Sequence, residues 1–435
     1  MYPNLYYFFK DLFGVEWQGL KIINSFGFFV AMSFVAGAWA LATELKRKQK
    51  QGLFSFTEEK VTVGAPASIT DLLVNFLLGF LMGFKIIGGF LMENAFEDPQ
   101  QFIFSGQGNW AMGILLGAFF AGLKWWELNK QKLPKPEQRI AKVWPHDRVG
   151  DLIIYAAIFG FAGAKLFDIL EAPSAFFAAL QAVKDGKQDA GSLLFSGLTF
   201  YGGLIVAAIA IIYYARKHKI GIIHLADAVA PVLMLGYAIG RVGCQVAGDG
   251  DWGIVNSAFI SDVNGQSILA TKEQFAAAMQ ANHGYLISKF GALDQVHHTA
   301  MQPFLGLPNW MFAYTFPHNV VGDGIALAGC QGMHCNYLPL PVFPTPFYEL
   351  VTCSILFLIL WSLRTKLKIP GQMAGIYLIF NGSERFLIEK IRVNAVYKIG
   401  GMSITQAEII SVLLIIVGVI LFTQSKKWFG KTVLK

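Results

Sequence analysis

Three arginines lie in or beside strongly apolar segments, where membrane proteins rarely carry charge. Arg241 ends the stretch LGYAIGR, and Arg385 and Arg392 bound the stretch RFLIEKIR. An ionisable side chain at such a place is costly unless it has a partner, and it commonly marks a functional site. The planar guanidinium of arginine binds phosphate through two parallel hydrogen bonds. The three arginines therefore predict a site for a phosphate-bearing ligand such as a phospholipid headgroup.

Carboxylates and tyrosines that could accept a proton accompany these arginines. Glu389 follows Arg385 by four residues, and an ion pair within one helix is the simpler alternative to a catalytic role. Tyr348 and Glu349 begin another apolar segment, where a glutamate could serve only the helix dipole. We place these groups, with Tyr201, in the outer half of the membrane or at its outer surface. Their convergence predicts one site facing the outer leaflet, where a tyrosine or glutamate takes a proton and arginines stabilise a leaving phosphate.

The composition predicts an integral membrane protein. Of the 435 residues, 54% are hydrophobic and 14% are charged, with a mean hydropathy of +0.49. A soluble protein has about a quarter of its residues charged. The net charge of +7 comes from short Lys and Arg clusters between apolar segments, which is typical of cytoplasmic loops and does not require a nucleic-acid partner. The N-terminus lacks the pattern of a cleavable signal peptide.

The apolar segments predict an all-α polytopic membrane protein with about nine transmembrane helices. Each segment has about 20 residues, the length that a bilayer requires. The predicted spans are 23–43, 72–92, 109–127, 150–170, 198–215, 224–243, 347–363, 373–390 and 406–423. Every odd-numbered loop is basic, so the N-terminus is expected outside and the C-terminus in the cytoplasm. The eighth loop is basic on the outer side, which favours an anionic ligand there.

The longest predicted loop, 254–346, is expected to form a small mixed extracytoplasmic domain between two transmembrane regions, 1–253 and 347–435. It contains Cys330 and Cys335, and two cysteines so close on the oxidising side predict a disulfide. His334 lies between them, so a metal site is the alternative, although one histidine and two cysteines make an incomplete tetrahedral set.

Two pairs of segments form an internal repeat. LLGFLMGFKIIGGFLMEN (77–94) resembles IFGFAGAKLFDILEAP (158–173), and FSGQGNWAMGILLGAFFAGL (104–123) resembles FSGLTFYGGLIVAAIAII (195–212). The alternative is that glycine-rich membrane helices resemble one another in any case. The shared FSG start favours duplication. We therefore predict a seven-helix core plus a duplicated hairpin.

With these motifs in place, the chain resembles the prolipoprotein diacylglyceryl transferase family. GRVGCQVAGDGDWG (240–253) is similar to the family signature, an arginine between glycines followed by a glycine, an acidic residue and an aromatic–glycine pair. Five further segments resemble the family in the same order: FSGLTFYGGLI (195–205), DAVAPVLMLGYAIGR (227–241), PTPFYE (344–349), RFLIEKIR (385–392) and MSITQAEIIS (402–411). The resemblance covers roughly 22–43, 150–253 and 340–425.

The resemblance implies a reaction. The diacylglyceryl group of phosphatidylglycerol would pass to the cysteine thiol of a prolipoprotein signal peptide, forming a thioether and releasing glycerol phosphate. It implies no cofactor and no metal. The expected partners are phosphatidylglycerol, prolipoprotein signal peptides and membrane lipid, without nucleic acid. The expected state is a monomer in the bacterial inner membrane, with its active site facing the outer leaflet.

The resemblance also implies residue roles. Arg241 would hold the phosphate, Arg385 would activate the thiol or neutralise the leaving phosphate, and Glu389 would orient Arg385. Tyr201 lies where many members have histidine, and a tyrosine with an ordinary pKa of about 10 is a poor base at neutral pH. The predicted catalytic residues are Tyr201, Arg241, Arg385 and Glu389, and the predicted substrate-binding residues are Arg241, Gly240, Gly202, Gly203, Asp249, Asp251, Gly253, Tyr348, Glu349 and Arg392.

Some alternatives remain open. A relative that binds lipid or signal peptides without catalysis, or acts on an altered substrate, would account for Tyr201 and for Cys244, which lies where the signature has asparagine. A transporter would account for repeated hairpins and buried charges, but the repeat is parallel and local rather than an inverted half. Either Asp249 or Asp251 could fill the acidic position of the signature, because this chain has one extra residue there.

Overall fold

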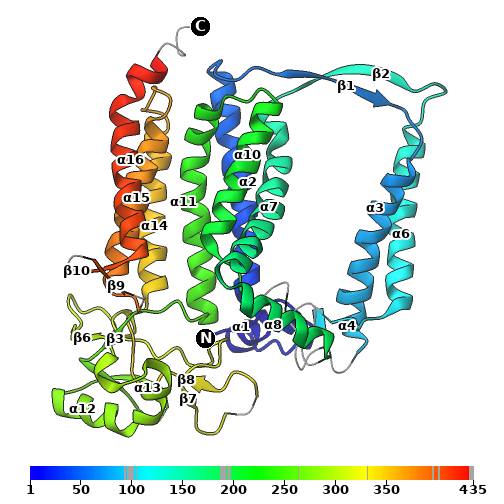
Figure 1. Ribbon diagram of the computed structural model, residues 1–435. Helices are drawn as coiled ribbons and strands as arrows, with labels where there is room; N and C mark the ends of the chain where they lie inside the picture. The colour runs from blue at the N-terminus through cyan, green and yellow to red at the C-terminus, as the bar shows by residue number, and fades with distance from the viewer. Residues whose placement is uncertain are drawn as a thin grey trace. The chain divides into compact units, whose positions relative to one another are not determined.

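The computed structural model describes residues 1–92, 95, 102–103, 105–186, 193, 197–262, 264–330, 332–393, 396–399 and 402–430. This part of the chain is mostly helical, with small two-stranded sheets (Figure 1). Eight of its helices are long and apolar enough to cross a membrane. The prediction of a helical polytopic membrane protein is therefore confirmed. Phe195 and Ser196, which contribute to the FSG match of the repeat, lie outside the described residues.

Each predicted span corresponds to a helix with similar bounds. They are α2 (Ser25–Lys50), α3 (Ile69–Leu81) continued by a π-helical turn at Met82–Ile87 into α4 (Gly88–Phe90), α6 (Trp110–Lys130), α7 (Val149–Glu171), α10 (Phe200–Lys217), α11 (Ile222–Ala247), α14 (Thr345–Leu363), α15 (Gln372–Glu389) and α16 (Gln406–Phe429). α15 is not among the eight apolar helices because it contains Glu384, Arg385 and Glu389. A total of nine spans stays a prediction.

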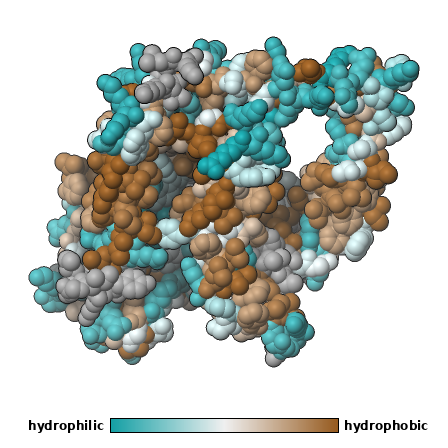
Figure 2. Space-filling view, turned by 45° about the horizontal axis from the view of Figure 1, so that its top comes forward, coloured by the Kyte–Doolittle hydropathy of each residue, from teal (hydrophilic) through white to brown (hydrophobic). Residues whose placement is uncertain are grey.

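Contacts divide the chain into two compact units. The first consists of Met1–Glu16, Ile23–Glu44 and Ile223–Lys435, and the second of Trp17–Ile22 and Leu45–Ile222. In both units apolar side chains cover the exposed sides of the helices, and hydrophilic ones gather near the helix ends (Figure 2). The regions predicted from the sequence, 1–253, 254–346 and 347–435, are defined by their position relative to a membrane. The contact-based units do not test them, and they stay a prediction.

The second unit contains two helical hairpins, α3 with α6 and α7 with α10. Both pairs approach closely at glycine: a Cβ on Gly83 would lie 2.2 Å from the Met112 carbonyl oxygen, and one on Gly163 would lie 2.5 Å from that of Gly202. Gly83 and Gly163 are matching positions of the sequence repeat, which agrees with a duplication. The unit also contains a helix, α8 (Pro173–Lys184), and an antiparallel ribbon of β1 (Thr57–Val63) and β2 (Glu137–Val143).

In the first unit, contacts near one end of α15 fix that helix against its neighbours. The Asp227 carboxylate of α11 accepts the backbone N–H groups of Gly371 at 2.8 Å and Ala374 at 2.9 Å, at the start of α15. Such a cap satisfies donors that have no partner within the helix. α15 also packs against α16 at Gly375 and Gly418, where either Cβ would lie within 3 Å of the opposite backbone.

The segment between α11 and α14 mixes short strands and helices around its own apolar core. Its elements are β3 (Val255–Asn256), β4 (Phe259–Ser261), β5 (Ser267–Leu269), α12 (Lys272–Ala281), α13 (His283–Phe290), β6 (His298–Thr299), β7 (Ile325–Ala326) and β8 (Asn336–Tyr337). The core includes Phe275, Leu286, Phe316 and Val342. We call this segment the external domain.

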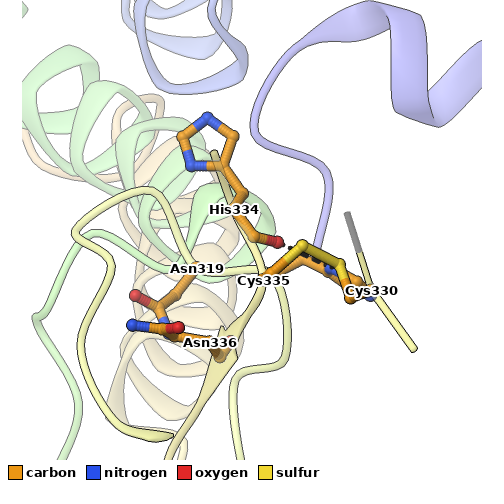
Figure 3. Close-up of a disulfide and its surroundings, with 6 residues drawn as sticks. Asn319, Cys330, His334, Cys335 and Asn336 are labelled. Atoms are coloured by element: carbon orange, nitrogen blue, oxygen red, sulfur yellow. Dashed lines mark hydrogen bonds between the residues drawn. A yellow bond between two sulfur atoms is a disulfide. The ribbon is translucent and has the colours of Figure 1, made fainter. Parts of the chain in front are cut away.

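The external domain contains a disulfide between Cys330 and Cys335, with Cα atoms 5.6 Å apart (Figure 3). Because the two sulfurs are bonded to each other, neither is a thiolate that could bind a metal. Nδ1 of His318 lies 2.7 Å from the His334 carbonyl oxygen. The nearby Asn319 side chain is fully buried and donates to the carbonyl oxygens of Phe316 and Asp323.

Candidate active site

The three arginines singled out in the sequence surround one buried glutamate in the first unit. Glu349, in the first turns of α14, is fully buried. One of its carboxylate oxygens lies 3.0 Å from Nε of Arg241 and 3.9 Å from Nη1 of Arg392. The other lies 3.7 Å from Nη1 of Arg385. Helices α11, α14 and α15 and the segment after α15 thus each contribute a charged group to one cluster.

Asp251 is a second anion in this cluster. It accepts a hydrogen bond from Nη1 of Arg241, and one from Nη2 of Arg392 at 2.6 Å. Burial would raise the pKa of the Asp251 carboxyl, but the two arginines outweigh burial and hold that pKa well below its usual range. Burial raises the pKa of Asp249, whose Oδ1 accepts the backbone N–H of Asp251. The geometry therefore makes Asp251, rather than Asp249, the partner of the arginines.

Glu389 and Arg385 form the ion pair that their spacing predicts. Nη2 of Arg385 lies 3.1 Å from Oε2 of Glu389, across one turn of α15. The Arg385 side chain is 25% exposed, against 13% for Arg241 and 12% for Arg392. Arg385 is therefore the most accessible of the three cations to an entering ligand.

Two residues of the cluster were not predicted as site residues. The Tyr237 hydroxyl donates to Oε1 of Glu349 at 2.7 Å, and the Arg241 guanidinium lies 5.1 Å from the centre of the Tyr237 ring. Glu384 is 3% exposed, and neither of its carboxylate oxygens has a hydrogen-bond partner among the described residues. Glu384 interacts electrostatically with Glu349 and the three arginines. A buried carboxylate without a donor is rare, so Glu384 has capacity to bind a ligand group.

Other predicted residues have structural partners. The Tyr348 hydroxyl donates to the Met311 carbonyl oxygen at 2.6 Å, so it ties α14 to the external domain. Gly253 pairs with Arg392 in an isolated bridge, and a Cβ there would lie 2.6 Å from the Ile391 carbonyl oxygen. A Cβ on Gly240 would meet nothing within 4 Å.

Tyr201, Gly202 and Gly203 begin α10 in the second unit. A Cβ on Gly202 would lie 2.4 Å from Cβ of Phe167, and one on Gly203 would lie 2.9 Å from the Gly160 carbonyl oxygen. Both glycines therefore serve the contact between α7 and α10. Their role in substrate binding, and that of Tyr201 in proton transfer, stay predictions.

Comparison with known proteins identifies the family. A sequence model of the prolipoprotein diacylglyceryl transferase family matches residues 109–424. The chain belongs to this family. The match includes α6 and the external domain, which lie outside the segments that resemble the family, and it does not include 22–43.

Relatives in this family carry the name phosphatidylglycerol–prolipoprotein diacylglyceryl transferase. One from Xylella fastidiosa (strain M12) is 25% identical over 290 residues, covering 64% of this chain and 78% of the relative. One from Neisseria meningitidis serogroup C (strain 053442) is 27% identical over 230 residues, covering 52% and 64%. One from Rickettsia felis is 31% identical over 153 residues, covering 35% and 51%.

A metal ion is a poor fit to the acidic loop of this diacylglyceryl transferase. Ligand atoms of Cys244, Asp249 and Asp251 lie within 4.8 Å of one another. Asp251, however, is already bound by Arg241 and Arg392, and their positive charges would repel a cation. The expectation of a reaction without a metal stays a prediction.

Exchanging either aspartate of the loop tests which one supports the transferase site. We expect Asp251→Asn to lower kcat/KM by about 100-fold, because two arginines lose a charged partner, and Asp249→Asn to change it by less than about threefold.

Because the folded pKa of Asp251 lies below the unfolded value of about 3.9, the stabilisation that its carboxylate gives the folded protein is complete above about pH 5 and is lost only at lower pH. The stability difference between wild type and Asp251→Asn, measured by unfolding in detergent, should therefore be constant from about pH 5 to 8. A difference that shrinks toward pH 6 would contradict this pairing.

Gly253 should tolerate no side chain in the transferase. A Cβ there would also lie 2.9 Å from Cγ2 of Thr345 and 3.0 Å from Cβ of Phe343, so Gly253→Ala must shift the isolated backbone bridge between Gly253 and Arg392. We expect a loss of about 2 kcal/mol of stability, as for other overpacked sites, and at least a tenfold loss of activity. Gly122→Ala, at a position of α6 where a Cβ would meet nothing within 4 Å, is the control for unfolding and turnover. Wild-type behaviour of Gly253→Ala would exclude a role for this close contact.

Proposed function

We propose that the protein transfers the diacylglyceryl group of phosphatidylglycerol to the lipobox cysteine of prolipoproteins, forming a thioether and releasing glycerol phosphate. Membership of the transferase family supports this reaction. The structural observation that carries the proposal is the buried cluster of Arg241, Arg385 and Arg392 around Glu349. The arginines supply donors for a phosphate, and the carboxylates hold the arginines in place.

Arg241 and Arg392 are proposed to bind the phosphate of the lipid. Nε and Nη1 of Arg392 are buried without a hydrogen-bond partner among the described residues. Arg241 uses Nε for Glu349 and Nη1 for Asp251, and no residue in the described part of the chain accepts from its Nη2, which we propose donates to the ligand. The three arginines face four carboxylates, those of Asp251, Glu349, Glu384 and Glu389. Since the charges of this cluster do not sum to a positive value, recognition of the phosphate is expected to depend on directed hydrogen bonds more than on net charge.

The reaction then needs a proton acceptor and a stabilised leaving group. The cysteine Sγ–H proton passes to a carboxylate, for which we propose Glu384, the member of the described cluster with no hydrogen-bond donor on either oxygen. The thiolate attacks the terminal glyceryl carbon of the diacylglyceryl group, and the bond between that carbon and the phosphate oxygen breaks. The electron pair leaves with glycerol phosphate, whose growing charge Arg241 and Arg385 stabilise.

The orientation in the membrane is also a proposal. Basic residues in the odd-numbered loops support an N-terminus outside, a C-terminus in the cytoplasm and a site at the outer leaflet. A monomer is the expected state.

An assay of the purified protein in phosphatidylglycerol vesicles tests the reaction. We expect glycerol phosphate release to match a diacylglyceryl mass gain on a lipobox peptide, and a peptide with serine in place of the cysteine to give neither. Folded protein that binds phosphatidylglycerol without turnover would instead identify a non-catalytic relative.

Tyr201→Phe distinguishes the two candidate proton acceptors. If Glu384 takes the proton, we expect Tyr201→Phe to keep kcat within about threefold and Glu384→Gln to lower it by at least about 100-fold. Both variants are measured by peptide mass under single-turnover conditions. The reverse order would assign the proton transfer to Tyr201.

A further inference from the structure

One loop of the external domain is apolar, exposed and uncharged. Residues 301–310, with the sequence MQPFLGLPNW, contain no charged side chain. The exposed fraction is 89% for Leu305, 55% for Phe304, 43% for Met301 and 40% for Trp310. Soluble surfaces rarely present so many large apolar side chains together without an interaction partner.

The loop is mounted firmly on the external domain. Nδ2 of the fully buried Asn256 donates to the carbonyl oxygens of Met301 at 2.9 Å and Phe312 at 3.0 Å, and its Oδ1 accepts the Met301 N–H. These bonds clamp both ends of the loop. The Phe304 ring packs against that of Phe312, with centroids 5.0 Å apart. These hydrogen bonds and the ring contact therefore fix the loop in a conformation that exposes its apolar side chains.

The tip of the loop is unfavourable in water. Leu305 and Gly306 both have left-handed backbone conformations, with φ of 55° and 68°, and Leu307 N–H closes the turn on the Phe304 carbonyl oxygen. A leucine in this conformation is uncommon. Here it also exposes nearly all of its side chain. Only an apolar environment would remove the free-energy cost of exposing this leucine side chain to water.

Contacts with α14 join the loop to a helix that is long and apolar enough to cross a membrane. The Trp310 ring packs edge-to-face on Phe347 at 5.0 Å, in the first turn of α14. Phe347, Val351, Ile355 and Leu358 recur at helical spacing, and the last three are 41%, 53% and 62% exposed. This stripe is an exposed apolar side of a candidate span, and we infer that it faces lipid. Trp310 continues the stripe beyond the helix end, and tryptophan is enriched where bilayers meet water.

We propose that loop 301–310 inserts into the outer leaflet, so that the external domain binds the lipid surface beside the active site. The occupant is phospholipid at the boundary between headgroups and acyl chains. The absence of charge in the loop, the exposed leucine at its tip and its continuity with the lipid-facing stripe of α14 all favour lipid. This inference does not depend on which residue takes the proton in catalysis.

Spin labels on the intact protein test the insertion. Leu305→Cys offers one reactive thiol under non-reducing conditions, because Cys330 and Cys335 are bonded and Cys244 and Cys353 are buried. Ile287→Cys is the matched control: Ile287 is 46% exposed on α13, which lies on the side of the external domain away from α14 and α15 (Figure 1). Both variants are reconstituted into phosphatidylglycerol–phosphatidylethanolamine vesicles without peptide.

We expect the label at position 305 to collide with oxygen rather than with a water-soluble nickel chelate, and its chelate accessibility to be at least fivefold below that of the label at position 287. Equal chelate accessibility at the two positions would overturn the proposal. Protection of position 305 only after a signal peptide is added would also overturn it, because the occupant would then be peptide rather than lipid.

Discussion

Replacing Arg241 with alanine is expected to lower kcat/KM for diacylglyceryl transfer by about 100- to 1,000-fold, the loss found when one donor to a developing anion is removed. The variant loses the proposed phosphate donors and leaves the fully buried Glu349 without its 3.0 Å partner. Arg241→Lys keeps a charge but loses the planar fork, and we expect it still to lose at least about tenfold. The measurement is peptide mass gain in phosphatidylglycerol vesicles.

Arg364 is a matched control at the other end of α14. It also pairs with a buried glutamate, since its Nε lies 3.3 Å from Oε2 of Glu44, and it stacks on Trp361 at 3.6 Å. Arg364→Lys should leave transfer within about threefold, because Arg364 takes no part in the active-site cluster. Full turnover by Arg241→Ala, with Arg364→Lys also unchanged, would remove Arg241 from the phosphate site.

Glu349→Ala is expected to show the largest combined loss of stability and activity. Glu349 accepts the Tyr237 hydroxyl, pairs with Arg241 and lies within 4 Å of Arg385 and Arg392. Removing one member of a buried ion pair typically costs about 3–5 kcal/mol, because the remaining charge stays buried without compensation. Unfolding in detergent measures the stability, and vesicle turnover should fall below detection.

Two further variants make the Glu349 result interpretable. Glu349→Gln keeps the side-chain shape and an acceptor for Tyr237, so it should lose less stability than the alanine variant. Glu127→Gln removes an exposed pair with Lys124, at 2.9 Å on α6, and should change stability by less than about 1 kcal/mol. An alanine variant no less stable than Glu127→Gln would show that Glu349 does not hold the arginines.

The transmembrane helices could be predicted because each is determined by the residues of its own segment. The length of each apolar run sets a helix that can cross a bilayer, so the prediction of 347–363 corresponds to α14 at Thr345–Leu363. Arg241, Arg385 and Arg392 could be singled out because charge is costly beside apolar runs. Glu349 could also be singled out, but its position between the three arginines follows only from the packing of three helices.

Side-chain direction explains why two adjacent predicted residues have different partners. Tyr348 and Glu349 are adjacent, yet successive residues of a helix point about 100° apart. Glu349 therefore faces the arginines while Tyr348 reaches Met311. Tyr237 lies one turn before Arg241, so its spacing held a usable signal. The missing donors around Glu384 follow only from tertiary packing.

The cap that Asp227 forms on α15 also joins the two helices that carry Arg241 and Arg385. Arg241 lies 14 residues beyond Asp227 on α11, and Arg385 lies 14 residues beyond Gly371, whose N–H Asp227 accepts. At 1.5 Å per residue, each arginine is roughly 21 Å along its helix from this contact. The two arginines thus lie at equal distances along their helices from the contact that joins them. A tilt of about 5° between α11 and α15 at this contact would change the spacing of the two guanidinium groups by roughly 2 Å.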